Sequence, residues 1–422
     1  METIMVAPVQ GMTGRRILIV GGGCAGITTA ATLKKHDSSL EIAIIEPSDL
    51  HWYQPGFTLV GAGIFTRAQT ERREETLIPK GVRWIKKAAA EFLPDQNAVR
   101  LQDNSLEHYD FLIACPGLKL AWEKIEGLTE SLGRNGVCSN YLPKYAQYTW
   151  DSIKGFRGGT ALFTQPPMPI KCAGAPQKIM YLMADHHRRQ GKLNQAKIEF
   201  CLAGDVMFGV PFFVPPLLDA VKDYGINVRY KHHLKAVDAA AKRAIFMVTD
   251  EAGATSEIEK SFDLMHVTPP QTGLDFVRAS PLANAAGWIE VDQGTLQHTR
   301  YQNIFGLGDA ASTPNAKTAA AVRMQVPVVV KNLLSVMKGQ KAAAVYDGYG
   351  SCPLTVAIGK IVLAEFAYGG KVTPSFPLDP RVPRRSMWYL KTKLLPWLYW
   401  NHMFGGGEFD IPHKERSFAK AA

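Results

Sequence analysis

A glycine-rich turn near the N-terminus is the first feature of the sequence that could bind a charged ligand. It fits the pattern G-x-G-x-x-G, directly after the apolar stretch 16–20 and before the helix-compatible stretch 27–35. Such a turn lets backbone amides approach a pyrophosphate, whose charge the helix N-terminus favours. The sequence therefore predicts a dinucleotide site with contacts from Gly21, Gly23, Cys24, Ala25 and Gly26.

An acidic residue stands where a dinucleotide site needs one. Glu46 follows the predicted strand 41–45 and lies about 20 residues beyond the turn, the spacing of a carboxylate that binds a ribose hydroxyl. Strand, turn, helix and acid together predict a Rossmann-like βαβ unit. The alternative is a structural glycine turn followed by an unrelated acid.

The rest of the chain reads as alternating strands and helices, which predicts an α/β fold. With 422 residues, 46% of them apolar and 20% charged, the chain is long enough for two domains and an appendage. The first unit is expected to continue with strands at 82–85, 98–101 and 111–114. The second is expected to hold strands at 160–164, 197–203, 227–230 and 264–268, and helices at 176–189 and 217–224.

Later segments indicate that the dinucleotide is FAD. Residues 112–117 resemble the apolar strand ending in Ala-Thr-Gly of two-dinucleotide-domain flavoproteins, although Cys115 and Pro116 depart from it. Residues 304–310 resemble the second FAD motif of those proteins, whose Asp contacts the ribityl chain. Residues 317–320 resemble a helix start that faces the isoalloxazine, where the helix N-terminus would stabilise reduced flavin. The resemblance adds Gly117, Asp309, Lys317, Thr318, Ala319 and Ala320 to the predicted FAD contacts.

The second unit lacks a matching turn. After its strand, Gly204 and Gly209 do not give the G-x-G-x-x-G spacing, and Asp205 would repel a pyrophosphate. This argues against NAD(P)H as the electron donor. Two other functions stay open for an FAD-binding chain of this kind. One is a type II NADH:quinone oxidoreductase, which would need a nicotinamide site, and the other is a non-enzymatic redox sensor that binds FAD without turnover.

Two cysteine-containing segments, 169–178 and 346–354, are the most distinctive in the chain. They read Pro-Ile-Lys-Cys-Ala-Gly-Ala-Pro-Gln-Lys and Tyr-Asp-Gly-Tyr-Gly-Ser-Cys-Pro-Leu. Both resemble segments of sulfide:quinone oxidoreductases, particularly the branch that includes the mitochondrial enzyme. Further runs of this kind lie at 53–55, 59–63, 266–270 and 317–321, and the likeness covers residues 16–406.

The resemblance implies that Cys172 and Cys352 form a redox-active disulfide beside the flavin. Sulfide would attack one sulfur and leave a persulfide, and which cysteine carries it stays open. Lys171 is expected to favour a thiolate at Cys172. The alternative is that both are inert buried thiols. The other four cysteines show no CxxC spacing and are expected as free thiols: Cys24, Cys115, Cys138 and Cys201.

Few other polar residues stand out. Gln54 matches a position near the flavin in the family, and Ala89 follows a strand that in such folds often lends backbone to the adenine. Glu365 could carry a proton, with a solvated or ion-paired carboxylate as the alternative. No metal site is predicted, because the histidines lack ligand spacing and are expected as surface or capping residues: His51, His232, His233, His298 and His402.

The C-terminal region combines basic and aromatic residues. From residue 381 onward, eight Lys or Arg stand against three Asp or Glu, and the stretch 386–404 holds three tryptophans. Pro396 is expected to split this stretch into two short amphipathic segments that lie in a membrane interface, anchored in part by Lys391 and Lys393. Docking on the core or on a partner chain is the alternative. No nucleic-acid partner is expected, because the basic residues are mixed with large apolar ones.

Together these observations predict two Rossmann-like domains of a glutathione-reductase-like flavoprotein and a C-terminal amphipathic membrane-associating region. The FAD-binding domain is expected at 14–150 and 270–350, the second domain at 151–269, and the redox-cysteine, quinone and membrane region at 351–422. Residues 1–14 lack the features of a secretory signal, and no membrane-spanning helix is expected.

The family resemblance completes the functional hypothesis. It implies FAD-dependent oxidation of hydrogen sulfide, with electrons passed to a ubiquinone-type quinone and sulfur to an acceptor such as sulfite or glutathione. It also implies a peripheral protein of the bacterial or mitochondrial inner membrane. The sequence leaves open which acceptor and quinone are used, whether FAD is covalently attached, and whether the chain forms a homo-oligomer.

Overall fold

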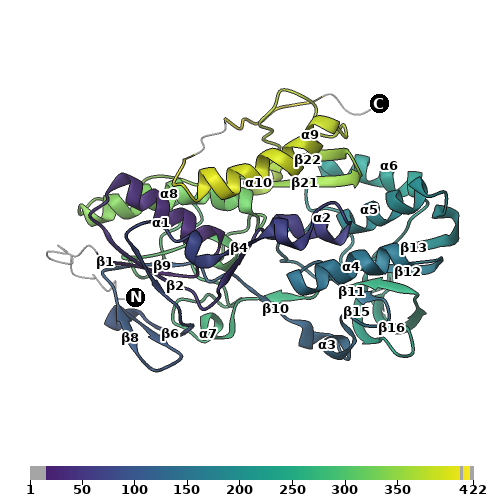
Figure 1. Ribbon diagram of the computed structural model, residues 1–422, viewed down its shortest axis with the longest axis horizontal. Helices are drawn as coiled ribbons and strands as arrows, with labels where there is room; N and C mark the ends of the chain where they lie inside the picture. The colour runs from purple at the N-terminus through teal and green to yellow at the C-terminus, as the bar shows by residue number, and fades with distance from the viewer. Residues whose placement is uncertain (1–15, 409–411, 419–422) are drawn as a thin grey trace.

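The computed structural model describes residues 16–408 and 412–418. The segment 1–14, which is expected to lack a secretory signal, lies outside the described residues. Figure 1 shows two α/β halves side by side, with the C-terminal helical segment running along one side of both.

The first half is built on a parallel sheet of five strands, in the order β20-β9-β1-β2-β5. Its strands are short apolar runs, as expected for a sheet covered on both faces. Because all five strands are parallel, the loops that follow them meet at one edge of the sheet, where a ligand can contact several loops at once. The strands are β1 Arg16–Val20, β2 Glu41–Ile45, β5 Val82–Ile85, β9 Phe111–Ala114 and β20 Ile304–Gly306.

Two long helices of this half, α1 (Cys24–His36) and α8 (Ala319–Met337), pack against each other. By length and composition alone α8 could cross a membrane, contrary to the expectation of no such helix. However, 56% of its apolar window is buried inside the protein, which is also typical of a core helix. A smaller antiparallel sheet flanks the half and consists of β6 Ala89–Leu93, β7 Ala98–Leu101 and β8 Leu106–His108.

The second half holds another parallel sheet, in the order β11-β18-β12-β13-β14. Its first strand, β11, lies within the span 14–150 that was expected to belong to the FAD-binding domain. The strands are β11 Val137–Cys138, β12 Gly159–Gln165, β13 Ala196–Leu202, β14 Asn227–Arg229 and β18 Leu264–His266. The helices are α3 Leu128–Ser131, α4 Pro143–Gly155, α5 Ala175–Arg189 and α6 Val214–Tyr224.

Small sheets and short helices complete the two halves. A meander is formed by β15 His232–Asp238, β16 Arg243–Thr249 and β17 Thr255–Ser261, and a hairpin by β21 Gly350–Ala357 and β22 Lys360–Phe366. Two further antiparallel pairs are β3 Leu50–Trp52 with β4 Glu71–Arg73, and β10 Lys119–Leu120 with β19 Gln271–Thr272. The remaining helices are α2 Phe57–Gly61 and α7 Asp275–Arg278.

The C-terminal segment is one continuous helical run, so the expected split at Pro396 is wrong. It passes from α9 (Arg385–Tyr389) through a π turn at Leu390–Leu394 into α10 (Leu395–Trp397) and a second π turn at Leu398–Met403. A proline ring inside an α-helix collides with the carbonyl four residues earlier. The wider π turns on both sides of α10 change this spacing and let the helical run continue through the proline.

Candidate functional site

A large cavity, of about 660 Å³, lies at the carboxyl edge of the first sheet. Its walls come from the loops of that sheet, from the start of α5 and from the C-terminal helical segment. The volume is in the range of cofactor and small-ligand sites. The predicted site residues that line it are Gly21, Gly23, Cys24, Ala25, Glu46, Gln54, Gly117, Cys172, Asp309, Lys317, Thr318, Ala319 and Ala320.

The glycine turn joins β1 to α1 and leaves space for a phosphate group. Gly21 has a φ of +107°, and a side chain there would collide with the backbone of Cys115. Gly26 does not line the cavity, but any Cβ on it would collide with the Gly21 carbonyl oxygen, so it allows α1 to pack closely on β1. At Gly23 and Gly117, which do line the cavity, a Cβ would meet no atom within 4 Å. This open space beside a helix N-terminus fits a pyrophosphate.

Two acids lie next to the turn, the half-buried Glu46 and the buried Glu74. Glu46 accepts hydrogen bonds from the backbone amides of Gly22 and Ser48, both at 2.9 Å. Burial raises the pKa of Glu46, and these amides oppose the shift. Glu74, which the sequence analysis missed, comes so close to Gly22 that a side chain there would collide with its Oε1 atom. That buried oxygen has no hydrogen-bond partner among the described residues, so it could accept a hydrogen bond from a ribose hydroxyl.

His51 is buried and not at the surface, contrary to the sequence expectation. Its Nδ1 lies 3.2 Å from Glu74 Oε2 and its Nε2 lies 2.7 Å from the hydroxyl of Tyr399. Since Tyr399 belongs to the C-terminal segment, these contacts fasten that segment to the expected ribose end of the site. Ala89, predicted near the adenine, begins β6 and is not among the described residues that line the cavity.

The start of α8 faces the cavity at the expected position. Thr318 caps the helix by accepting a hydrogen bond from the Ala321 amide at 3.2 Å. Lys317 is buried and donates to the carbonyl oxygens of Asp309 and Ala311 at 2.9 and 2.8 Å. Burial lowers the pKa of Lys317 to about 8 and raises that of the Asp309 carboxyl. Lys317 therefore fixes the loop that carries Asp309.

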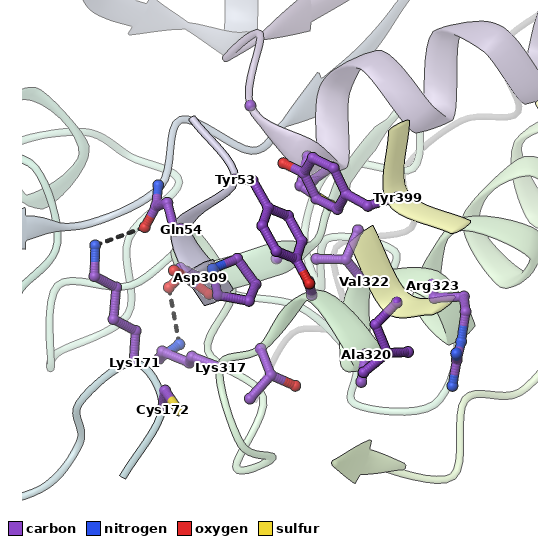
Figure 2. Close-up of a pocket in the computed structure, with 18 of the residues that line it drawn as sticks. Tyr53, Gln54, Lys171, Cys172, Asp309, Lys317, Ala320, Val322, Arg323 and Tyr399 are labelled. Carbon is purple, nitrogen blue, oxygen red and sulfur yellow. Dashed lines mark hydrogen bonds between the residues drawn. The ribbon is translucent and has the colours of Figure 1, made fainter. Parts of the chain in front are cut away.

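Lys171 lies beside Lys317, and Figure 2 shows its amine turned toward Gln54. Its Nζ donates to Gln54 Oε1 at 2.7 Å. Burial lowers the pKa of Lys171, whereas the charges of Asp309 and Cys172 raise it, so Lys171 favours a thiolate at Cys172 as expected, but without contacting the sulfur. The amine that contacts Cys172 Sγ belongs to Lys178, in the first turn of α5, a residue that was not among the predicted site residues.

The two predicted redox cysteines meet at this wall of the cavity. Their Sγ atoms are 3.7 Å apart, although 180 residues separate them in sequence. Cys172 has a φ of +51°, in the left-handed region, and its amide donates to the Lys317 carbonyl at 3.1 Å. Cys352 is buried on β21, adjoining the cavity. Gly174 makes the approach possible, because any side chain there would collide with Cys352 Sγ.

The surroundings of the two thiols differ. Lys178 Nζ lies 2.9 Å from Cys172 Sγ and 3.9 Å from Cys352 Sγ. The hydrogen bond from Cys352 and the charge of Lys178 hold the pKa of Cys172 well below its ordinary value, although burial opposes the shift. The same hydrogen bond and burial raise the pKa of Cys352. Burial disfavours the ammonium of Lys178, but the thiolate charge outweighs it and raises the lysine pKa to about 12. The shorter contact with Lys178 and these opposite pKa shifts both favour Cys172 over Cys352 as the thiolate of the reduced pair.

A second buried amine approaches from the C-terminal segment. Lys391 lines the cavity and is 4% exposed, which corrects the expectation that it anchors the chain at a membrane surface. Burial, and then repulsion by Lys178, lowers the pKa of Lys391 to about 7. Lys393, two residues further on, is exposed as expected. Helical spacing alone cannot tell which of the two lysines points inward.

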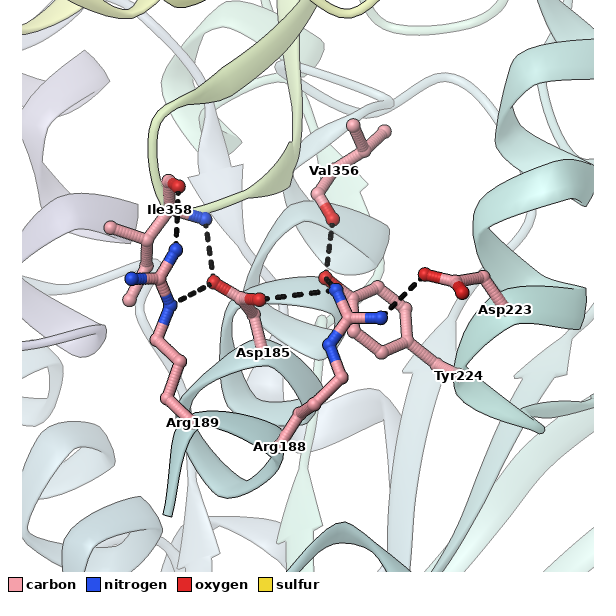
Figure 3. Close-up of polar contacts among 7 residues, drawn as sticks. All are labelled: Asp185, Arg188, Arg189, Asp223, Tyr224, Val356 and Ile358. Atoms are coloured by element: carbon pink, nitrogen blue, oxygen red, sulfur yellow. Dashed lines mark hydrogen bonds and ion pairs between the residues drawn. The ribbon is translucent and has the colours of Figure 1, made fainter. Parts of the chain in front are cut away.

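A polar network away from the cavity joins the two elements that carry the thiol site, α5 and the β21–β22 hairpin. Near the end of α5, Asp185 accepts hydrogen bonds from Arg189 Nε at 2.8 Å and from the amide of Ile358 at the hairpin tip at 2.9 Å. Tyr224, on α6, donates to the Val356 carbonyl at 3.0 Å. Figure 3 shows these contacts converging on the hairpin. They fix the hairpin, and with it Cys352, against α5.

Curated proteins resemble the chain over nearly its whole length. It is 41% identical to the mitochondrial sulfide:quinone oxidoreductase of Mus musculus over 390 residues, which cover 92% of this chain and 86% of that protein. It is 40% identical to the enzyme of the same name from Dictyostelium discoideum, covering 93% and 87%. No family model matches the chain.

Solved structures agree on the fold. The crystal structure of the sulfide:quinone oxidoreductase of Aquifex aeolicus superposes with a TM-score of 0.77 at 19% identity, covering 93% of this chain and 92% of that one. At this identity the likeness supports the fold alone. It confirms the predicted α/β fold.

Proposed function

The chain belongs to the sulfide:quinone oxidoreductase family, and from this premise we propose that it oxidises hydrogen sulfide through a Cys172–Cys352 redox pair, FAD and a membrane quinone. One observation supports this proposal most strongly. The sulfur atoms of the two cysteines lie 3.7 Å apart beside a cavity whose lining includes a glycine turn suited to a pyrophosphate. Burying the ammonium of Lys178 costs free energy, and inert core cysteines would give no negative charge to offset that cost.

FAD fits the cavity as the proposed cofactor. The glycine turn would hold the pyrophosphate, Glu46 and Glu74 the adenosine ribose, and Asp309 and the N-terminus of α8 the flavin end. Bound there, FAD supplies a two-electron acceptor that is reoxidised by the quinone.

The unequal thiols suggest the direction of sulfide attack. Hydrosulfide would attack a disulfide sulfur and break the S–S bond, so that one cysteine carries the new S–SH group and the other leaves as a thiolate. A thiol of lower pKa leaves faster, which favours release of Cys172 and a persulfide on Cys352. Lys178, 2.9 Å from Cys172 Sγ, would stabilise the released thiolate. A nucleophile such as sulfite or glutathione would then remove the outer sulfur, and the two thiols would return two electrons to FAD as the disulfide re-forms.

We also propose peripheral attachment to a membrane, so that the quinone can enter the cavity from lipid. Leu390, Leu394 and Leu395 of the C-terminal segment line the cavity, and large apolar side chains beside them are exposed. Such a surface suits the interface of a bilayer. The exposed residues are Phe376, Leu378, Val382, Tyr389, Leu394 and Trp397.

Anaerobic stopped-flow mixing of the FAD-loaded protein with sulfide tests the proposal. We expect the flavin absorbance to bleach with sulfide and to return on addition of decylubiquinone. Cys172→Ser and Cys352→Ser should each keep the flavin but abolish bleaching by sulfide, whereas Cys201→Ser, a matched change at a core cysteine, should retain it. Bleaching by NADH and not by sulfide would refute the proposal, and normal turnover of either serine variant would refute the dithiol mechanism.

A further inference from the structure

The hairpin side of the cavity combines apolar side chains with a few hydroxyl groups and contains one acid. Glu365, on β22, is 3% exposed and lines the cavity together with Leu363, Phe376 and leucines of the C-terminal segment. Among the described lining residues there are three other carboxylates, and all belong to the loops of the first half: Glu46, Glu74 and Asp309. Glu365 is thus the carboxylate placed where an apolar substrate would enter.

Two hydroxyl groups connect to this carboxylate. Tyr349 donates its O–H to Glu365 Oε1 at 2.5 Å, and Ser375 donates its O–H to the same oxygen at 2.6 Å. The Ser375 amide donates to Oε2 at 3.0 Å. Burial and the charge of Glu365 raise the pKa of Tyr349, so the phenol keeps its proton. A carboxyl group with two hydroxyl neighbours can pass protons along hydrogen bonds.

We propose that Glu365 is the proton donor for quinone reduction, with Tyr349 and Ser375 as the groups that re-protonate it. The inference rests on the proposed function, which supplies the quinone and its two electrons. Reduction turns each quinone carbonyl oxygen into a hydroxyl, so two protons are consumed with the two electrons. The carboxyl would transfer its proton to one oxygen as negative charge develops there, and solvent would restore that proton before the second transfer. In an apolar cavity an unprotonated, anionic product would be strongly disfavoured.

Charged groups surround this relay on both sides. Arg323, on α8, lies 3.5 Å from the Tyr349 hydroxyl through Nη2, and the His413 ring lies 4.5 Å from the Tyr349 ring. A small hollow of about 10 Å³ also adjoins Glu365; its lining is mostly apolar, with Asp379 and Arg384 as its other charged residues. The charged and titratable groups next to the relay are therefore Arg323 and His413 at Tyr349, and Asp379 and Arg384 at this hollow.

The test separates the quinone half-reaction from the sulfide half-reaction. FAD-loaded protein is reduced with dithionite and then mixed with decylubiquinone or, separately, with ferricyanide, which accepts electrons without protons. For Glu365→Gln we expect reoxidation by the quinone to slow by about 100-fold or more, while reoxidation by ferricyanide and bleaching by sulfide stay at wild-type rates. Tyr349→Phe should show a smaller loss, and Glu259→Gln, at an exposed acid, should show none.

Each outcome decides one point. Reoxidation of Glu365→Gln by the quinone at the wild-type rate would overturn the inference, as would equal slowing with both oxidants, which would mean a disturbed cofactor. If Glu365→Gln fails to fold, wild-type rates in both Tyr349→Phe and Ser375→Ala would overturn it. If sulfide fails to reduce even the wild-type protein while Glu365→Gln is slow with quinone, the proposed function falls and the proton-donor role stands.

Discussion

The buried Lys178 amine donates a hydrogen bond to Cys172 Sγ at 2.9 Å and so brings a positive charge next to that sulfur. Replacing Lys178 by Met removes the positive charge and keeps most of the side-chain volume. The pKa of Cys172 is depressed in the native protein, so its thiolate persists down to a lower pH than that of an ordinary cysteine. Without Lys178 this pKa should rise, because the positive charge that favours the thiolate is gone.

The pH dependence of alkylation by iodoacetamide measures this shift in the reduced protein, since the thiolate is the reacting form. We expect the midpoint to move to higher pH in Lys178→Met. Lys171→Met is the matched control, because the Lys171 amine bonds to Gln54 and not to a sulfur, and it should move the midpoint far less. Equal midpoints in Lys178→Met and the wild type would contradict the assignment of Lys178.

The sequence predicted the residues whose role depends on local spacing and missed those whose role depends on contacts between distant elements. The glycine turn and Glu46 belong to one contiguous βαβ unit, so their positions follow from it. Lys391 and His51 reach the cavity only when the C-terminal segment and β3 pack around it, whereas Lys178 lies six residues from Cys172 and contacts it because the chain turns back at the start of α5. A lone lysine or histidine in a sequence carries no sign of such a contact.

At the scale of elements, the position of Cys352 depends on how the β21–β22 hairpin is held against α5. Asp185, 3% exposed, joins the two, since it accepts hydrogen bonds from the hairpin backbone and from arginines of α5 (Figure 3). Asp185→Asn keeps the shape of the side chain but loses the charge that these donors satisfy. We expect it to lower the free energy of unfolding by about 1 to 3 kcal/mol. The arginines are partly exposed, so solvent screens their charges and keeps the loss within this range.

Urea unfolding measures the loss in stability, and the rate of disulfide formation between Cys172 and Cys352 after reduction measures the positioning of the sulfurs. We expect Asp185→Asn to slow disulfide formation as well as to destabilise the protein. Asp223→Asn is the matched control, because Asp223 contacts the same network from an exposed position and should change stability by less than about 1 kcal/mol. A destabilised Asp185→Asn that forms the disulfide at the wild-type rate would show that the network stabilises the fold without positioning Cys352.

The elements predicted from apolar runs agree with the structure, whereas the C-terminal segment differs in a way that follows from its backbone. Pro396 ends an α-helix in most contexts, and the sequence gives no sign of the π turns that let this one continue. The continuous run places Lys391 and Tyr399 inside the cavity and leaves Tyr389 and Trp397 exposed. The predicted amphipathic character is therefore present, but one face of the segment completes the site.

At the scale of the whole molecule, the cavity and the exposed apolar surface share the C-terminal segment, which runs along one side of both halves in Figure 1. Membrane attachment and quinone access would then depend on the same element. Deleting the segment would remove a cavity wall, so substitutions at its exposed side chains isolate the membrane contribution better. Val382, just before the segment, and Tyr389 and Trp397 within it are 45%, 54% and 55% exposed and do not line the cavity, so replacing all three by Ser should leave the lining at Lys391 and Tyr399 in place.

Flotation with vesicles of phosphatidylcholine and an anionic lipid measures the attachment. We expect the triple variant to bind at least about tenfold more weakly, because three large apolar side chains no longer enter the interface. Its flavin should still bleach with sulfide at the wild-type rate, since the thiol site is untouched. The matched control replaces Leu106, Leu218 and Val345 by Ser, which are exposed on other elements and should leave binding unchanged. Equal binding by the triple variant and the wild type would show that these three side chains do not make the membrane contact. The quinone would then have to reach the apolar opening of the cavity from solution.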